Sequence, residues 1–321
     1  MDNNSIARIA QDFRKLSTEL STIIVGNNNV LEQMLIALLC NGHVLLEGLP
    51  GVAKTTMIKT LCQTLGLSFK RIQFTPDLLP SDLVGTLVFN PKTVEFETKK
   101  GPIFAHIILA DEINRAPAKV QSALLECMQE HQVTIGSTTF LLDEPFMVFA
   151  TQNPLEQEGT YRLPEAQVDR FLFKLLIDYP QAQQEVQIIE RSQQELAVHQ
   201  IMQREELLAA QQAVKKIFVD KAIIEYIVAI VQATRNPAAA GLTKLREYIL
   251  CGASPRASLA LHHAAQGHAL LQQRDFVTPD DVKKIAHPVL RHRIIPHYQA
   301  SLDMISNDEI INTILATIPT P

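Results

Sequence analysis

The stretch "GLPGVAKTT", residues 48–56, decides the fold of this chain. The apolar segment "HVLLEG" (43–48) leads into it, and a helical pattern from about Lys54 to Leu65 follows it. A phosphate cradle needs inward-facing backbone N–H groups, the N-terminus of a helix and a lysine that reaches the β- and γ-phosphates. The order of strand, glycine loop, lysine and helix predicts such a cradle. Its expected residues are Gly48, Leu49, Pro50, Gly51, Val52, Ala53, Lys54, Thr55 and Thr56.

Ala53 departs from the usual pattern, which has glycine just before the lysine. Glycine is essential there only if the backbone needs a positive φ or if a methyl group would strike a phosphate. We therefore expect residue 53 to keep a conformation open to residues with a Cβ, with that Cβ directed away from the phosphates. Taken alone, the stretch also fits an ordinary strand-to-helix turn.

Two acids and an amide end later apolar segments. "AHIILADE" (105–112) ends in Asp111 and Glu112, and "FMVFATQN" (146–153) ends in Asn153. Ligands of open parallel sheets bind at the carboxyl ends of the strands, so these side chains are expected beside the phosphates. Asp111 together with Thr55 is the expected Mg²⁺ site, and Glu112 is available to orient and deprotonate a water molecule. Asn153 is placed to hold that water or to sense the γ-phosphate.

Five apolar segments separated by helical patterns predict an α/β core with a parallel sheet covered by helices on both faces. The segments are residues 43–48, 69–74, 105–112, 146–153 and 171–179. Residues 85–104 alternate around an Asn-Pro-Lys turn and predict an inserted β-hairpin, which either packs on its own domain or contacts a substrate. We expect a core at 1–185, a helical linker at 186–204 and an all-α lid domain at 205–321. Asp220, Ser254 and the Thr278–Asp281 pair are expected helix caps in that domain.

Composition narrows the class of protein. The 321 residues have a net charge of −5, which argues against nucleic acid as a partner. The longest apolar segment, 30–49, is interrupted by polar residues, so no membrane insertion is expected. Four scattered cysteines are typical of reduced thiols in a cytoplasmic protein. The ten histidines lack metal-binding spacing.

The motifs together resemble one family. The stretches "RIQFTPDLLPSDLVGT", "ADEINRAPAKVQSALLECMQE", "ATQNPLEQEGTYRLPEAQVDRF" and "GASPRASLAL" are similar to successive blocks of the MoxR-type AAA+ ATPases. The likeness runs from about residue 22 to about residue 295. Alanine before the lysine is itself usual in that family.

The resemblance implies roles for residues of this chain. Val25 and Gly26 would lie near the adenine of ATP or ADP. The implied catalytic set is Lys54 and Thr55 of Walker A, Asp111 and Glu112 of Walker B, Asn153 as sensor 1, Arg256 as sensor 2, and Arg170 as the arginine finger. The family has proline where this chain has Arg162, so Arg162 is a second candidate for the finger. Arg115 is a third.

The resemblance also implies a mechanism and partners. Nucleotide would bind between the core and the lid of a hexameric ring, and Mg²⁺-dependent ATP hydrolysis would drive chaperone-like remodelling of protein clients. A protein with a von Willebrand factor A domain is an implied partner. The alternatives are a chelatase-like motor subunit that inserts a metal into a cofactor, a DNA-associated motor, and a nucleotide-dependent scaffold without hydrolysis.

Overall fold

The computed structural model describes residues 3–154, 160–191 and 197–321. Its centre is a sheet of five parallel strands in the order β2-β5-β8-β1-β9. The strands are β1 (Val44–Gly48), β2 (Phe69–Gln73), β5 (Ile107–Asp111), β8 (Met147–Gln152) and β9 (Phe173–Ile177). Each lies inside one of the five apolar segments, which confirms the predicted α/β fold. The central strands β1, β5 and β8 are buried and almost continuously apolar, whereas the edge strand β2 exposes polar side chains.

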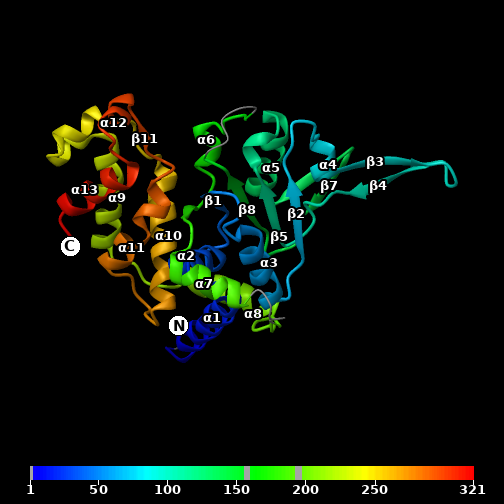
Figure 1. Ribbon diagram of the computed structural model, residues 1–321, viewed down its shortest axis with the longest axis horizontal. Coiled ribbons are helices and arrows are strands. Elements are labelled where there is room, and N and C mark those ends of the chain that lie inside the picture. Colours follow the sequence, from blue (N-terminus) through cyan, green and yellow to red (C-terminus); the bar gives the residue numbers. More distant parts are fainter. Residues whose placement is uncertain (1–2, 155–159, 192–196) are drawn as a thin grey trace.

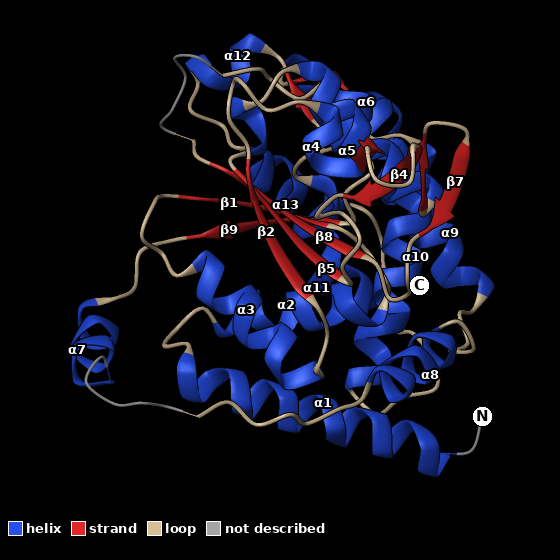
Figure 2. Cartoon of the chain, turned by 90° about the vertical axis from the view of Figure 1, so that its right-hand side faces the viewer, coloured by secondary structure: helices blue, strands red, loops and turns tan. Residues whose placement is uncertain are grey.

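Two helical layers cover the sheet (Figure 2). Successive strand side chains point to opposite faces, so Leu46 packs into one hydrophobic cluster and Leu45 into the other. The helices over the Leu46 face include α1 (Asn3–Ile23), α2 (Asn28–Leu39) and α3 (Lys54–Leu65). Those over the Leu45 face are α4 (Pro80–Val84), η1 (Ile113–Arg115) and α5 (Ala118–Glu130), with α6 (Glu165–Val168) at the edge.

The predicted hairpin is present as β3 (Gly85–Asn90) paired antiparallel with β4 (Glu95–Lys100). It extends away from the body of the molecule (Figure 1). Phe89 and Phe96 form a T-shaped pair near its end, with ring centroids 5.5 Å apart, and remain 49% and 67% exposed. The outer half of the hairpin therefore does not pack on its own domain, which removes one of the two expected arrangements.

A second hairpin was not predicted. It consists of β6 (Gln132–Ile135) and β7 (Thr138–Leu141), joined by Gly136 and Ser137. Gly136 has a φ of +62°, as tight hairpin turns require. The two hairpins meet where Leu87 lies against Gly136.

The segment predicted as a helical linker, 186–204, is helical only in part. Helix α7 (Ala182–Arg191) begins earlier and ends within it, residues 197–203 form no helix, and α8 (Arg204–Val214) begins at its last residue. Helix α7 has no buried residues, and its apolar side chains Val186, Ile188 and Ile189 are exposed. Residues 192–196 lie outside the described residues.

The C-terminal part is helical, as predicted. Its elements are α9 (Lys221–Arg235), η2 (Pro237–Ala240), η3 (Thr243–Glu247), β10 (Ile249–Cys251), α10 (Pro255–Leu271), α11 (Pro279–Leu290), β11 (Ile295–Pro296), α12 (Tyr298–Leu302) and α13 (Asn307–Thr317). All three predicted caps form: Asp220 accepts from Ala222 N, Ser254 from Arg256 N, and Asp281 from Thr278 N. One hydrophobic cluster runs from Ile6 in α1 to Ile314 in α13, so the lid packs directly on the core.

None of the helices in the described ranges combines the length and apolarity that crossing a membrane requires.

Candidate nucleotide-binding site

The glycine loop curls around its own lysine. Gly48 ends β1, Lys54 begins α3, and Lys54 Nζ donates a hydrogen bond to Gly48 O at 2.6 Å. Ala53 has φ +59° and ψ +22°, which is the left-handed region. Our expectation of an ordinary φ at residue 53 was therefore wrong, and the alanine holds a conformation that costs an L-residue about 1–2 kcal/mol. The direction of its Cβ relative to bound phosphates stays a prediction.

A cavity of about 390 Å³ opens over this loop. It brings together the lysine, the hydroxyl, the two acids and the amide that the sequence predicted from three separate segments. Its lining residues are Pro50, Gly51, Val52, Ala53, Lys54, Thr55, Thr56, Arg71, Asp111, Glu112, Thr151 and Asn153. The carboxyl ends of β1, β5 and β8 meet here, which is where an open parallel sheet binds ligands.

Neighbouring side chains hold both carboxylates of this cavity. Asp111 Oδ1 accepts from Thr151 Oγ1 at 2.6 Å, and Asp111 Oδ2 accepts from two nitrogens of Arg71 at 2.6 and 3.0 Å. Glu112 Oε2 accepts from Gln73 Nε2 at 2.8 Å and from Arg115 at 3.1 Å. In this arrangement the polar ends of β2 and β8 fix the positions of both acids.

Sequence reasoning missed Arg71, Gln73 and Thr151. Arg71 and Gln73 alternate around the buried Ile72 at the end of β2, so they share one face of the strand. That alternation of polar residues at a strand end was the available signal. Pairing of β2 with β5 then places Gln73 opposite Asp111.

A second cavity, of about 510 Å³, adjoins the first and shares Gly51, Val52, Ala53 and Thr56 with it. Its other lining residues are Ile23, Ile24, Val25, Asn27, Met57, Lys59, Thr60, Gln63, Pro180, Ile188, Arg191 and Val198. Val25 lines this cavity, and Gly26 has the left-handed φ of +76° between two lining residues. Their place beside adenine stays a prediction. Apolar walls beside a phosphate loop suit a flat heterocycle such as adenine.

The lid contributes no lining residue to either cavity within the described part of the chain, since the last such residue is Val198. The expected position of nucleotide between core and lid stays a prediction. Helix α7 and the N-terminal segment bound the second cavity instead.

The four arginines of interest lie in different surroundings. Arg115 pairs with Glu112 at 3.1 Å, in the site of its own chain. Arg170 is half-buried and donates to Leu125 O at 2.9 Å. Arg256 lies 3.8 Å from Asp169 Oδ2, and Arg162 is 85% exposed and lies 3.6 Å from Glu165. Arg256 lines neither cavity.

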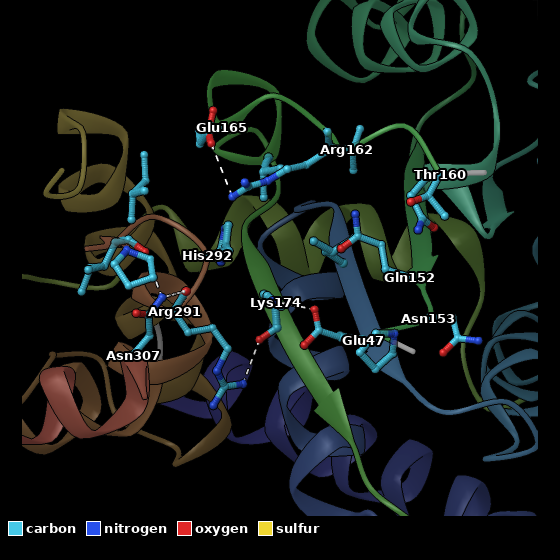
Figure 3. Close-up of a pocket in the computed structure, with 18 residues that line it drawn as sticks. Glu47, Gln152, Asn153, Thr160, Arg162, Glu165, Lys174, Arg291, His292 and Asn307 are labelled. Atoms are coloured by element: carbon cyan, nitrogen blue, oxygen red, sulfur yellow. Dashed lines mark hydrogen bonds and ion pairs between the residues drawn. The ribbon is translucent and has the colours of Figure 1, made fainter. Parts of the chain in front are cut away.

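Figure 3 shows a third cavity, of about 390 Å³, between α6 and the lid. Arg162 and Glu165 lie on one side, and Arg291, His292 and Asn307 come from the lid. Lys174 bonds Glu47 at 2.7 Å within it. Asn153 lines this cavity as well as the phosphate-loop cavity, so the two adjoin at the end of β8.

Comparison with known proteins agrees with this geometry. Residues 43–173 match the model of the ATPase family associated with various cellular activities (AAA), and residues 243–314 match the AAA lid domain. Chaperone MoxR1 of Mycobacterium tuberculosis is 49% identical over 304 residues, which are 94% of this chain and 81% of that protein. Protein MoxR of Paracoccus denitrificans is 31% identical over 346 residues, which cover 100% of this chain and 99% of that one. The chain belongs to the MoxR-type AAA+ ATPases.

A solved structure extends the likeness of this AAA+ chain to its whole length. The crystal structure of a candidate ATPase from Cytophaga hutchinsonii superposes with a TM-score of 0.93 at 46% identity. The superposition covers 99% of this chain and 97% of the other. The arrangement of core and lid seen here is therefore shared with that protein.

Membership of the AAA+ ATPases implies nucleotide and, as usual for such sites, Mg²⁺. The residues present fit the ion: Thr55 and Asp111 offer oxygen ligands in one cavity, and Mg²⁺ is commonly held by one or two carboxylates plus substrate phosphates. Both Asp111 oxygens accept hydrogen bonds from Thr151 and Arg71, so direct coordination would replace one of those contacts. No cluster of three or more His, Cys, Asp or Glu residues occurs among the described residues, and a site completed by phosphates needs none.

Proposed function

We propose that this chain hydrolyses ATP with Mg²⁺ and uses the energy for chaperone-like remodelling of protein clients as a ring, with six subunits the expected number. The observation that carries the proposal is the phosphate-loop cavity. Lys54, Thr55, Asp111, Glu112 and Asn153 come from three strand ends and line one space there. A strand-to-helix turn without ligand-binding function would not need that convergence.

The residues of the chain suggest the following division of work. Lys54 would exchange its bond with Gly48 O for contacts to the β- and γ-phosphates. Glu112 would orient a water molecule and accept its proton as the oxygen attacks the γ-phosphorus, while Asn153 holds the water. The bond to the bridging oxygen breaks, giving ADP and phosphate. Mg²⁺, when bound between Thr55 and Asp111, supplies positive charge for the phosphate oxygens.

Completion of the site by a neighbouring subunit rests on where the arginines lie. Arg170 and Arg256 lie near Asp169, and neither lines the phosphate-loop cavity of its own chain. Arg170 Nε is buried with no hydrogen-bond partner among the described residues, so this donor of the guanidinium is available for another hydrogen bond. An arginine supplied in trans raises the hydrolysis rate of other NTPases by about 10³–10⁵-fold.

A protein client is supported by the name of the 49% identical chaperone relative and by the exposed Phe89–Phe96 pair of the hairpin. Exposed apolar surface of this kind is typical of protein contacts. A partner with a von Willebrand factor A domain and a place in the cytoplasm belong to the same proposal. The four cysteines are all free, which suits a reducing compartment.

The test is Glu112→Gln measured beside the matched control Glu126→Gln, an exposed acid on α5. Glu112→Gln should keep ATP binding and lose steady-state phosphate release by about 10²-fold or more, the range of a general base. Glu126→Gln should behave like wild type. If Glu112→Gln released phosphate at the wild-type rate, the catalytic assignment would be wrong.

A further inference from the structure

Asp169 joins the core to the lid at a single carboxylate. It is the residue that follows α6, immediately before Arg170, and its side chain is only 13% exposed. Oδ1 accepts from Arg293 Nε at 2.8 Å, and Oδ2 accepts from Ser254 Oγ at 2.7 Å. Two separate lid segments, one after α11 and one at the start of α10, therefore meet on this side chain.

Arg293 reinforces the junction with its remaining nitrogens. Its side chain is 3% exposed and donates to the backbone oxygens of Asp169 at 3.1 Å, Phe171 at 2.6 Å and Leu172 at 3.1 Å. Burial lowers the pKa of the Arg293 guanidinium from its ordinary value, and the negative charge of Asp169 opposes that shift. A buried guanidinium that bonds three of the four carbonyls in the turn 169–172 fixes that turn to the lid.

The same carboxylate reaches Arg256. Ser254 caps α10 by accepting from Arg256 N at 3.1 Å while its hydroxyl donates to Asp169. Arg256 itself lies 3.8 Å from Asp169 Oδ2. Asp169 is thus one residue away from Arg170 along the chain and in ion-pair distance of Arg256 through space.

We propose that Asp169 is a positioning residue through which the lid sets the place of Arg170 in the neighbouring subunit's site. This inference rests on the proposed function. The turn 169–172 carries Arg170 and is bonded on its inner side to Arg293, so a movement of the lid displaces Arg170 with it. The Arg170 side chain has one hydrogen bond to the core, from Nη1 to Leu125 O at 2.9 Å, whereas the turn that carries it receives three from Arg293.

The experiment compares Asp169→Asn, a change of nearly equal shape, with wild type. The variant should bind ATP unchanged, because Asp169 lines neither nucleotide cavity, and should hydrolyse it about 10²-fold more slowly, the effect of a misplacement of about 1 Å. Mixed with Glu112→Gln subunits it should regain hydrolysis, since those subunits bring an intact Arg170 to its intact site. Damage to the variant's own site would give no such recovery.

Hydrogen exchange gives a readout that does not depend on hydrolysis. The amides of Arg170 and Phe171 bond Gln167 O and Val168 O and should exchange faster in Asp169→Asn. The matched control is Asp308→Asn, which removes the carboxylate partner of Arg291, a lid arginine that bonds Lys174 O but not the 169–172 turn. It should keep wild-type hydrolysis and wild-type exchange at these two amides.

Several outcomes would overturn the inference. They are wild-type hydrolysis by Asp169→Asn, unchanged exchange at the two amides, or no recovery in mixed rings that demonstrably form. If Asp169→Asn does not fold, Arg293→Lys decides by the same measurements, because lysine keeps the charge but cannot fork to several carbonyls. If Arg170→Ala keeps full hydrolysis, the proposed trans arginine fails together with the inference. Suppose that Arg170→Ala loses hydrolysis and regains it when mixed with Glu112→Gln subunits. If Asp169→Asn then neither loses hydrolysis nor regains any in the same mixture, only the inference fails.

Discussion

Two aspartate–arginine pairs of this chain share an Nε–carboxylate hydrogen bond, but their arginines differ in exposure. Arg71 Nε lies 3.0 Å from Asp111, and Arg293 Nε lies 2.8 Å from Asp169. The side chain of Arg71 is 50% exposed beside the phosphate-loop cavity, whereas that of Arg293 is 3% exposed between core and lid. The first pair is therefore open to solvent on its arginine side, and the second is enclosed between core and lid.

The difference in exposure corresponds to a difference in place: one pair lies at the candidate ligand site, and the other holds the core and the lid together. Exposed ion pairs contribute about 0–1 kcal/mol and are easily exchanged for other partners. Removing one member of a buried pair leaves an uncompensated charge and costs about 3–5 kcal/mol. Charge at the nucleotide site is therefore available for a ligand, while charge at the junction is bound within the fold.

The largest expected effect tests this contrast directly. Arg293→Met should lower the free energy of unfolding by about 3–5 kcal/mol, because it removes a buried guanidinium and leaves the Asp169 carboxylate and three backbone carbonyls without that donor. Arg71→Met should lower it by at most about 1 kcal/mol. Urea unfolding of both variants measures the two values. Equal losses would show that the two pairs do not differ in the way their burial indicates.

The pH dependence of stability tests two buried histidines, His43 in the core and His292 at the junction. Burial lowers the pKa of His43 to about 4, and its Nδ1 accepts from Val148 N while Nε2 donates to Met128 O, so the ring is neutral in the fold. Burial and the neighbouring Arg293 lower the pKa of His292 at the junction well below its ordinary value. The unfolded chain takes up protons below about pH 6.5, so stability is present above that pH and falls on acidification, by about 3 kcal/mol for His43 near pH 4.

Urea unfolding between pH 4 and 7 checks this second expectation. His43→Gln, which cannot be protonated, should lose less stability on acidification than wild type, and His292→Gln should do so through the junction. A wild-type profile that stayed flat over this range would contradict the neutral state of both rings.

The smallest expected effect concerns the loop itself. Ala53→Gly should raise the free energy of unfolding by up to about 1 kcal/mol, because relief of the left-handed strain exceeds the added freedom of the unfolded chain. Ala229→Gly in the middle of α9 is the matched control and should lower stability by about 1 kcal/mol. If both changes destabilised the protein, the positive φ at residue 53 would carry no strain.

The sequence by itself determined most of the elements and most of the residues that line the phosphate-loop cavity. The apolar strands, the glycine loop that starts α3, and the acids that end β5 are local patterns, and the caps at Asp220 and Ser254 are local hydrogen bonds. Short-range propensity and polarity suffice for features of this kind. The family likeness came from the same local blocks.

Only the tertiary structure decided which distant groups meet. Arg71 reaches Asp111 across 40 residues, and Arg293 reaches Asp169 across 124. The positive φ of Ala53, the lid's absence from the lining of both described nucleotide cavities, and the position of Arg256 beside Asp169 were likewise not visible in sequence. The packing of the helices on the sheet determines which residues at such separations meet. The sequence around an arginine does not show whether packing leaves it exposed at a ligand site or buries it between core and lid.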